Sequence, residues 1–472
     1  MRNLSWWKKA FAVLLHCAAT AIAAQAQTFT TIVNFDGTNG GAPYYGALVQ
    51  GRDGHLYGTT KGGGSDNQGT VFRVSPAGKV TSLYSFCAQT NCIDGSQPYA
   101  GLVLGVDGNF YGTTALGGVS CSLSSSLCGT VFRLTLSGTL TTLYSFCAQV
   151  GCPDGNLPES SLVQATDGNL YGVTYAGGNC ENTGCGTIFR ITPQGFLTTM
   201  RSFNFDDGEG PVGALIQAND KSLYGTTSAC LFYDCFGTVY KMTLSGALTT
   251  LYSFGSEGEP YGALVQTPDG LFYGTTVDCA IFDITSAGAF TYLDCIFGNE
   301  GYQPYAGLAL GSDGNLYGTA VYGGTSANCP SGCGTVFQVT PSGSLTSLHS
   351  FQLSDGAYPY SALYQATDGK FYGTTSGGGA VGVGTIFSLD MGLAPFVTFV
   401  RAAGKVGQTG GILGQGFTGT TNVSLNGIPA SFTVVSDTFI KATVPAGAAT
   451  GYVTVITPSG TLTSNVPFHV IK

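Results

Sequence analysis

The chain has 472 residues, of which 43% are hydrophobic and 12% aromatic, so it has enough apolar side chains to bury a folded core. Its formal charge of −9 at pH 7 argues against a nucleic-acid-binding protein, which needs a basic surface. Its 73 glycines and 18 prolines indicate many tight turns.

The first 26 residues have the pattern of a secretory signal. Basic residues precede an apolar stretch from Ala10 to Ala24, and residues 24–26 (AQA) form the small-x-small pattern that signal peptidase cleaves. A membrane anchor is the alternative, but the stretch is shorter than the roughly 20 apolar residues that span a bilayer. We therefore expect cleavage after residue 26 and a mature protein without a transmembrane segment, either secreted or at the bacterial cell surface.

The cysteines beyond the signal lie in close pairs along the chain. Zinc binding is the competing use of such spacings, but no histidine lies near any pair, and local disulfides are typical of an exported protein. We expect seven disulfides, which stiffen loops more than they hold the fold because most of the closed loops are short. The pairs are Cys87/Cys92, Cys121/Cys128, Cys147/Cys152, Cys180/Cys185, Cys230/Cys235, Cys279/Cys295 and Cys329/Cys333.

One unit recurs seven times, with a period of about 50 residues that is typical of propeller blades. Each unit predicts four short strands, which in the second unit cover residues 100–104, 110–114, 130–135 and 140–146, joined in part by Asp-Gly and Ser-Gly turns. A tyrosine in the motif YGTT marks the second strand, and we expect it to lie in the core between units. These tyrosines are Tyr57, Tyr111, Tyr171, Tyr224, Tyr273, Tyr317 and Tyr372.

The two ends of the repeat array complete each other. The seventh unit stops after its third strand, near Leu389, and the missing fourth strand matches Phe29–Phe35 (FTTIVNF) near the N-terminus. An N-terminal strand that completes the last unit closes a ring and removes its open edges. The predicted fold class is all-β, with a seven-bladed β-propeller over residues 27–392 that the N-terminal strand closes.

Two resemblances accompany these patterns. The blocks at residues 100–114 (AGLVLGVDGNFYGTT) and 129–146 (GTVFRLTLSGTLTTLYSF) resemble the GloVer tandem repeats of bacterial "choice-of-anchor" exported proteins. That resemblance implies export and a surface or extracellular location, and it brings no reaction with it. Residues 393–472 resemble an IPT/TIG domain through GILGQGF (411–417), VSLNG (423–427) and VPAG (444–447), which implies a small immunoglobulin-like β-sandwich.

Strand order places the two long connections of every unit at one end of the propeller, here named the long-loop face. The Asp-Gly and Ser-Gly turns lie at the other end, the turn face. All the cysteine pairs belong to the long connections or border them, so we expect the functional surface on the long-loop face.

An acidic residue followed by glycine and then by proline recurs ahead of each first strand. Seven carboxylates near the mouth of a channel would suit a cation such as calcium, which is the one cofactor that we consider. The alternative is structural, because Asp-Gly is a favoured turn pair. The acidic ring comprises Asp36, Asp94, Asp154, Asp207, Glu257, Glu300 and Asp355.

Tyrosines follow several of these prolines, at Tyr44, Tyr99, Tyr261, Tyr305 and Tyr360. They either stack on sugar rings in a pocket or pack between blades. Residues outside the repeat pattern are the better candidates for specificity, because a ligand without seven-fold symmetry cannot engage all blades alike. The candidate ligand-binding residues in the long connections are Asp66, Asn67, Glu181, Asn182, Tyr233 and Asp234.

No catalytic residues are predicted, because the histidines are far apart in the repeat scheme and no nucleophile motif occurs. The leading hypothesis is a binding or adhesion protein whose propeller holds an extracellular glycan or protein, with no nucleic-acid partner. The alternative is a carbohydrate-active hydrolase or lyase that uses two carboxylates of the long-loop face.

Overall fold

The structure, a computed structural model, describes residues 27–119, 128–180, 185–228, 236–255 and 258–471, so the predicted signal lies outside it. These residues are almost entirely strand and turn, with two short 3-10 helices, η1 (Thr90–Cys92) and η3 (Gly298–Glu300). The predicted all-β class is confirmed. In the described ranges, no helix has the length and hydrophobicity that a membrane crossing requires.

Four-stranded antiparallel sheets follow one another along the described chain, each in sequence order. The first two contain β2 (Val49–Gln50), β3 (Leu56–Thr60), β4 (Thr70–Val74) and β5 (Val80–Ser85), then β6 (Val103–Leu104), β7 (Phe110–Thr114), β8 (Thr130–Leu134) and β9 (Leu140–Ser145). The third and fourth contain β10 (Val163–Gln164), β11 (Leu170–Thr174), β12 (Thr187–Ile191) and β13 (Leu197–Ser202), then β14 (Ile216–Gln217), β15 (Leu223–Thr227), β16 (Thr238–Met242) and β17 (Leu248–Ser253).

The fifth and sixth sheets repeat this order. They contain β18 (Val265–Gln266), β19 (Phe272–Thr275), β20 (Ala280–Ile284) and β21 (Phe290–Cys295), then β22 (Ala309–Leu310), β23 (Leu316–Ala320), β24 (Thr335–Val339) and β25 (Leu345–Ser350). The seventh combines β26 (Tyr364–Gln365), β27 (Phe371–Thr375) and β28 (Thr385–Asp390) with β1 (Thr28–Asn34) from the other end of the chain.

The recurring pattern within each repeat is explained by contacts inside the sheet. Tyr111 is fully buried, and its hydroxyl donates to Asp107 Oδ2 at 2.8 Å across the Asp-Gly turn. The glycine of YGTT is required because a Cβ at Gly112 would lie 2.6 Å from the ring of Phe132 and 2.9 Å from Leu102. The predicted core role of the YGTT tyrosines is confirmed, since all seven are at most 7% exposed.

First strands are shorter than predicted, because the residues before them bond to neighbouring sheets. The carbonyl of Ala100 accepts the hydroxyl of Thr59 from the first sheet at 2.6 Å, and the amide of Gly101 donates to Ser161 Oγ of the third sheet at 3.0 Å. These backbone groups are therefore not available to the ladder with β7, and β6 pairs over two residues only.

The seventh sheet packs against the first. β1 pairs antiparallel with β28 from Thr28 to Asn34, which confirms the pairing predicted for the N-terminal strand. Gln50 of β2 accepts the amide of Thr367 at 3.0 Å and donates to its hydroxyl at 2.9 Å, and Phe35 contacts Phe72 with ring centroids 5.3 Å apart. The last sheet is thus joined to the first by buried polar and apolar contacts.

The C-terminal residues form two further four-stranded sheets and a parallel pair. One sheet has the order β29 (Thr398–Phe399), β31 (Thr409–Leu413), β35 (Phe439–Thr443), β34 (Phe432–Ser436). The other has the order β33 (Ile428–Pro429), β32 (Asn422–Leu425), β36 (Val453–Thr457), β37 (Gly460–Thr463). The pair is β30 (Ala403–Lys405) with β38 (His469–Ile471). Both four-stranded sheets contribute to one core, which includes Ile412, Ile440, Val423 and Val455.

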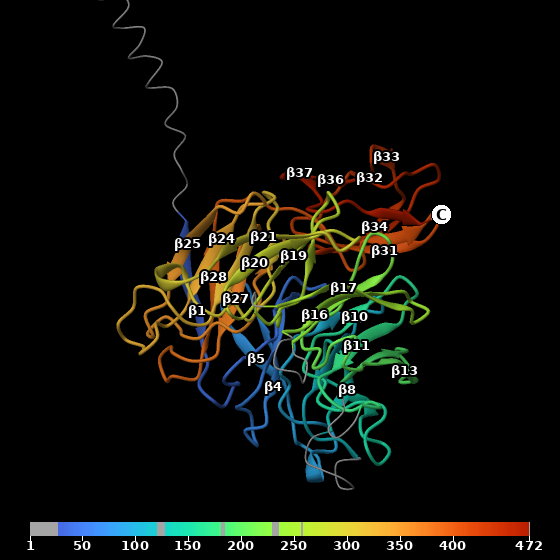
Figure 1. Cartoon of the computed structure of the whole chain (residues 1–472). Helices are drawn as coiled ribbons and strands as arrows, with labels where there is room; N and C mark the ends of the chain where they lie inside the picture. The colour runs from blue at the N-terminus through green and yellow to red at the C-terminus, as the bar shows by residue number, and fades with distance from the viewer. Residues whose placement is uncertain (1–26, 120–127, 181–184, 229–235, 256–257, 472) are drawn as a thin grey trace, which may run out of the picture.

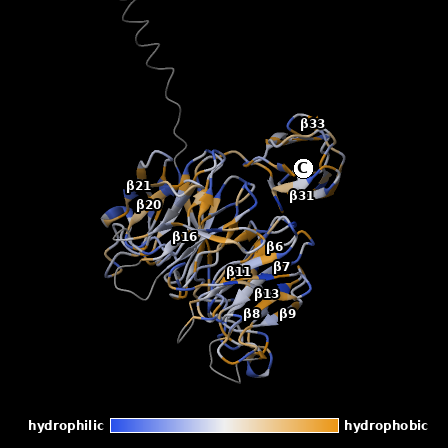
Figure 2. Ribbon diagram, turned by 45° about the vertical axis from the view of Figure 1, so that its right-hand side comes forward, coloured by the Kyte–Doolittle hydropathy of each residue, from blue (hydrophilic) through white to orange (hydrophobic). Residues whose placement is uncertain are grey.

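The C-terminal sheets contact the turn face. Thr438 donates to the carbonyl of Arg52 at 2.7 Å, and the Arg52 guanidinium lies 4.7 Å from the centroid of Phe439. Figure 1 shows these strands, coloured red, at one end of the repeat sheets, and Figure 2 shows hydrophobic residues concentrated along the strands. The long-loop face therefore lies at the end away from the C-terminal sheets.

Candidate functional site at the mouth of the central cavity

One cavity of about 110 Å³ is lined by residues from all seven repeat sheets. The lining residues lie just ahead of the first strand of each repeat, where the polypeptide passes from the long-loop face into the sheet. They include Tyr45, Ala100, Glu159, Gly213, Tyr261, Tyr305 and Tyr360. A concave site shared by every repeat is where one ligand could contact several sheets at once.

Four tyrosines line this cavity, Tyr45, Tyr261, Tyr305 and Tyr360, and two more, Tyr44 and Tyr99, pack against them. These six are here named the tyrosine cluster. Ring centroids lie 5.5 Å apart between Tyr305 and Tyr360, 5.4 Å between Tyr261 and Tyr305, and 4.5 Å between Tyr44 and Tyr360. The structure thus brings together all five tyrosines that the sequence suggested as a possible stacking surface. It adds Tyr45, which follows Tyr44 directly.

Glu159 takes the place of tyrosine in the third repeat. It follows Pro158 as Tyr305 follows Pro304, and it lines the same cavity as Tyr45 and Tyr261. Burial raises the pKa of Glu159 to about 7, although the positive charge of Lys61 acts in the opposite direction. The sequence analysis missed Glu159 because it looked for acids that recur in every repeat. Glu159 occurs in one repeat only, at the position where other repeats have a tyrosine after the proline.

Two further glutamates lie close to this site. The pKa of Tyr175 is raised by burial and then by the charges of Glu159, Glu209 and Glu259, so all three carboxylates act on one half-exposed tyrosine. Burial raises the pKa of Glu209, while burial and the nearby charge of Asp278 raise that of Glu259. The mouth of the cavity is therefore acidic as well as aromatic.

One cation accompanies these acids. The ammonium of Lys61 lies 4.6 Å from the ring centroid of Tyr99 and 5.0 Å from that of Tyr44. Lys61 follows the YGTT motif of the first repeat directly, where the third repeat has Tyr175. The tyrosine faces on this side of the cluster thus already stabilise a positive charge.

Ser160 is a polar group at the cavity wall without a partner. Its side chain is only 3% exposed, and its hydroxyl has no hydrogen-bond partner among the described residues. Buried hydroxyls are normally hydrogen-bonded, so an unpaired one in a residue of the cavity wall is a polar group that a turn of its side chain would offer to a ligand.

The described members of the acidic ring form hydrogen bonds or ion pairs with residues that are close to them in the sequence. Asp94, fully buried, accepts the hydroxyl of Tyr84 at 2.8 Å and the amide of Ala88 at 3.0 Å. Asp154 accepts Tyr144 in the same way, and Asp207 pairs with Arg201. Tyr84, Tyr144 and Arg201 each belong to the fourth strand of the preceding sheet, so these acids bond each long connection to the strand from which it leaves.

Asp36 and Asp355 follow the same local pattern. Asp36 accepts the amides of Thr38 and Asn39, which lower its pKa. Burial alone would raise the pKa of Asp355, but its hydrogen bonds from His349 and from the amide of Gln352 outweigh burial and lower it. The carbonyl of Glu300 accepts the hydroxyl of Thr335, and Glu257 lies outside the described residues.

The structure does not bring the described ring acids together as a cation site. Within the described ranges, no group of three or more histidine, cysteine or acidic side chains is placed to hold a metal ion. Calcium binding by the ring has no support from this geometry.

Five of the predicted disulfides are present, and each joins the predicted partners: Cys87–Cys92, Cys147–Cys152, Cys180–Cys185, Cys279–Cys295 and Cys329–Cys333. Both members of another predicted pair, Cys230 and Cys235, lie outside the described residues.

Cys128 is the described member of the remaining predicted pair, Cys121/Cys128. Its side chain is fully buried and disulfide-bonded, and it packs with Cys147 and Cys152 in one apolar cluster. Its backbone carbonyl accepts the amide of Leu157 at 3.0 Å. The predicted partner, Cys121, lies outside the described residues, so the disulfide state of Cys128 agrees with the prediction while its pairing with Cys121 stays a prediction.

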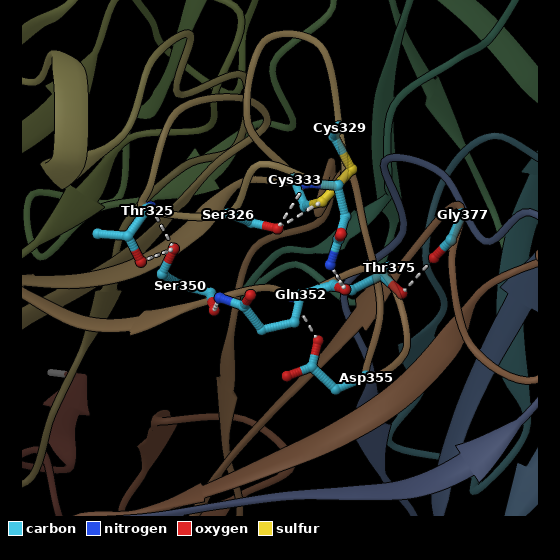
Figure 3. The surroundings of a disulfide bond; sticks show 10 residues. Thr325, Ser326, Cys329, Cys333, Ser350, Gln352, Asp355, Thr375 and Gly377 are labelled. Atoms are coloured by element: carbon cyan, nitrogen blue, oxygen red, sulfur yellow. Dashed lines mark hydrogen bonds between the residues drawn. A yellow bond between two sulfur atoms is a disulfide. The ribbon is translucent and has the colours of Figure 1, made fainter.

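The loop closed by Cys329–Cys333 is bonded on both sides. Figure 3 shows Thr325 against Ser350 at the end of β25, with Ser326 beside Cys333. The carbonyl of Cys333 also accepts the amide of Tyr358 from the following connection at 2.9 Å. The disulfide therefore lies within an ordered network that links two long connections.

Two of the candidate ligand-binding residues are described. Asp66 and Asn67 are exposed, and Asn67 Oδ1 accepts the amide of Gly63 at 2.8 Å within its own loop. Neither lines the central cavity. Glu181, Asn182, Tyr233 and Asp234 lie outside the described residues.

Comparison by sequence gives one family. The model of the Gloeobacter/Verrucomicrobia repeat matches residues 19–228, 124–279 and 277–427. No curated protein matches the chain.

Comparison by structure gives distant likenesses. The extracellular domain of a protein described as a one-component system, from B. thetaiotaomicron, is 13% identical with a TM-score of 0.50, over 94% of this chain and 59% of that one. The corresponding domain of a hybrid two-component system from the same organism is 10% identical with a TM-score of 0.49, over 94% and 57%. An oligogalacturonate lyase from Vibrio parahaemolyticus is 12% identical with a TM-score of 0.46, over 77% and 96%. At these identities the likeness concerns the propeller-like fold alone, and this chain spans less than two thirds of either extracellular domain.

Proposed function

The chain belongs to the Gloeobacter/Verrucomicrobia repeat family, and we propose that it is a secreted or cell-surface protein that binds an extracellular glycan at the mouth of its central cavity. In this proposal residues 1–26 are a signal peptide, residues 27–392 form a seven-bladed propeller, and residues 393–472 form an immunoglobulin-like domain. That domain covers the turn face and leaves the long-loop face to the ligand. The local disulfides suit an oxidising location outside the cell.

The observation that carries the proposal is the tyrosine cluster around a cavity lined by all seven repeat sheets. Tyrosine combines a flat apolar face, which covers the C–H face of a sugar ring, with a hydroxyl that hydrogen-bonds. All six tyrosines are only partly buried, and four of them line the cavity.

An oligosaccharide array probed with the mature protein tests the proposal, followed by titration of the hits. Tyr305→Ala and Tyr360→Ala should each weaken binding about ten-fold, as expected for a stacked aromatic worth about 1.4 kcal/mol. Tyr292→Ala is the matched control, because Tyr292 is 50% exposed on β21 and does not line the cavity. An array without hits, or tyrosine variants that bind like the unmodified protein while melting normally, would overturn the proposal.

A second candidate function, a carbohydrate-active hydrolase or lyase, is favoured by Glu159. A carboxyl with a pKa of about 7 can hold a proton near neutral pH and donate it to a leaving group. Product analysis of each bound oligosaccharide separates the two functions. New chain ends that are absent with Glu159→Gln would identify an enzyme, and unchanged oligosaccharides after long incubation would identify a binding protein.

A further inference from the structure

We propose that the glycan bound at the cavity mouth carries free, protonated amino groups, and that one ammonium lies between Glu159 and the ring faces of the tyrosine cluster. This inference rests on the proposed function and specifies its ligand. Three independent features of the described residues carry it.

The first feature is that the cluster already accommodates a cation. Lys61 places its ammonium 4.6 and 5.0 Å from the ring centroids of Tyr99 and Tyr44. Tyr261, Tyr305 and Tyr360 are neighbours in the cluster, with centroids 5.4 and 5.5 Å apart and ring planes inclined by 76° and 51°. No lysine or arginine of the described chain lies over these three rings, so they remain open to the cation of a ligand.

The second feature is an excess of carboxylates without counter-ions. Glu159, Glu209 and Glu259 all act on Tyr175, and Asp278 acts on Glu259. None of these four acids belongs to the ion pairs of the described chain, and Lys61 is the one cation that acts on Glu159. Glu259 has a hydrogen bond with Tyr261 but no counter-ion. A partly buried carboxylate without a counter-ion is costly, and a ligand ammonium would reduce that cost.

The third feature is the unpartnered hydroxyl of Ser160. It follows Glu159 directly, is 3% exposed and lines the same cavity. An ammonium has three N–H donors and no acceptor, so it can donate to the Glu159 carboxylate and, once the Ser160 side chain turns toward the cavity, to the Ser160 oxygen as well. The carboxylate, the hydroxyl and the aromatic faces form a set that an N-acetylated sugar, with a neutral amide, satisfies less well.

Three oligosaccharides of equal length test the inference by calorimetric titration of the mature protein: a glucosamine oligomer, its fully N-acetylated form and a glucose oligomer. The measurement is made near pH 6, where glucosamine is largely protonated. Glu159, with a pKa of about 7, is then mostly protonated in the free protein, so binding of the ammonium should release a proton from this carboxyl. The free amine should bind at least about ten-fold more tightly than the other two. Raising the salt concentration should weaken only the amine form, because screening acts on charge pairs.

Glu159→Gln should remove this preference while keeping the weaker binding of the N-acetylated form. Asp206→Asn is the matched control, since Asp206 is exposed on another long connection and does not line the cavity. It should leave the preference unchanged. Ser160→Ala, read in the same way, should reduce the preference without abolishing it.

The possible outcomes separate the two claims. Equal affinity for all three oligomers, together with loss of binding in Tyr305→Ala, would overturn the amine inference and leave the glycan site in place. A preference for the amine that survives Glu159→Gln would place the cation elsewhere and also overturn the inference. No binding of any oligosaccharide would overturn the proposed function and this inference with it.

Discussion

The strands of the repeat sheets and the mouth of the central cavity are built from the same repeat, but their polar side chains differ in whether they have hydrogen-bond partners. In six sheets the YGTT tyrosine donates to the aspartate of the preceding turn, as Tyr57 does to Asp53. At the cavity mouth the residue after the recurring proline changes from Tyr305 to Glu159 to Val212, and Ser160 has no partner. The residues that recur in every repeat therefore stabilise the sheets, and the residues that differ between repeats form the surface available to a ligand.

Deletion of residues 28–34 should produce the largest effect on the scaffold. β1 pairs with β28 along its length, so its loss leaves a long unpaired edge and uncovers apolar residues of the seventh sheet. We expect aggregation or loss of the cooperative thermal transition, and a synthetic peptide of residues 27–35 should restore part of it. A deletion variant that melts like the mature protein would show that the sheets do not depend on this strand.

Phe132→Ala should be the next largest change and should act on stability alone. Phe132 is fully buried, contacts Phe86 and fills the space beside Gly112. Removing such a ring costs about 3–5 kcal/mol of the free energy of unfolding, measured by denaturant titration. Phe196→Ala, at a residue 75% exposed, should stay within about 0.5 kcal/mol. Loss of ligand affinity in Phe132→Ala under conditions where it is fully folded would contradict the separation of scaffold and site.

Tyr111→Phe should cost less, because it removes one hydrogen bond and keeps the ring. The hydroxyl donates to Asp107, which also accepts the side chain of Asn109. The expected loss is about 0.5–1.5 kcal/mol in the free energy of unfolding. Tyr292→Phe provides the exposed control. A neutral result at Tyr111 would mean that the recurring Asp-Tyr pair serves turn geometry and not stability.

Glu159→Gln differs from the changes above because its effect on stability depends on pH. Burial raises the pKa of Glu159 from 4.5 in the unfolded chain to about 7 in the folded one, so ionisation disfavours the folded state as the pH rises between these values. The variant lacks this loss, and its melting temperature relative to the unmodified protein should rise by about 2–4 °C from pH 4.5 to pH 8. A difference that is independent of pH would show that Glu159 is solvated like a surface carboxylate.

The sequence predicted most of the scaffold because its signals are local and recur. Strand residues 110–114 and the turn at Asp107-Gly108 follow from alternation and turn chemistry, and the pairing of β1 with β28 follows from the missing fourth strand. The first strand at 100–104 was predicted too long, because its backbone groups bond to Thr59 and Ser161 of neighbouring sheets. Such contacts between repeats are not visible in one repeat.

The site was predicted less completely. The five tyrosines were recognised from their position after proline, but the acids that matter at the cavity were not, since Glu159 appears once and Glu209 and Glu259 lie outside the recurring Asp-Gly pair. The recurring acids were predicted as a site because they repeat. In the structure, however, Asp94 and Asp154 accept hydrogen bonds from Tyr84 and Tyr144 of the adjacent fourth strands. Which carboxylates face the cavity depends on how seven sheets converge, and periodicity alone does not encode it.

Amide hydrogen exchange with and without a bound glucosamine oligomer tests most directly whether the ligand site is the cavity mouth. We expect slower exchange on binding at residues 44–47, 99–101, 305–307 and 360–362, which form or adjoin the cavity wall. The turn face should stay unchanged, including Thr166, whose carbonyl accepts a hydrogen bond from Arg401 of the C-terminal region. Protection confined to the turn face, with none at the tyrosine cluster, would contradict a ligand site at the cavity mouth.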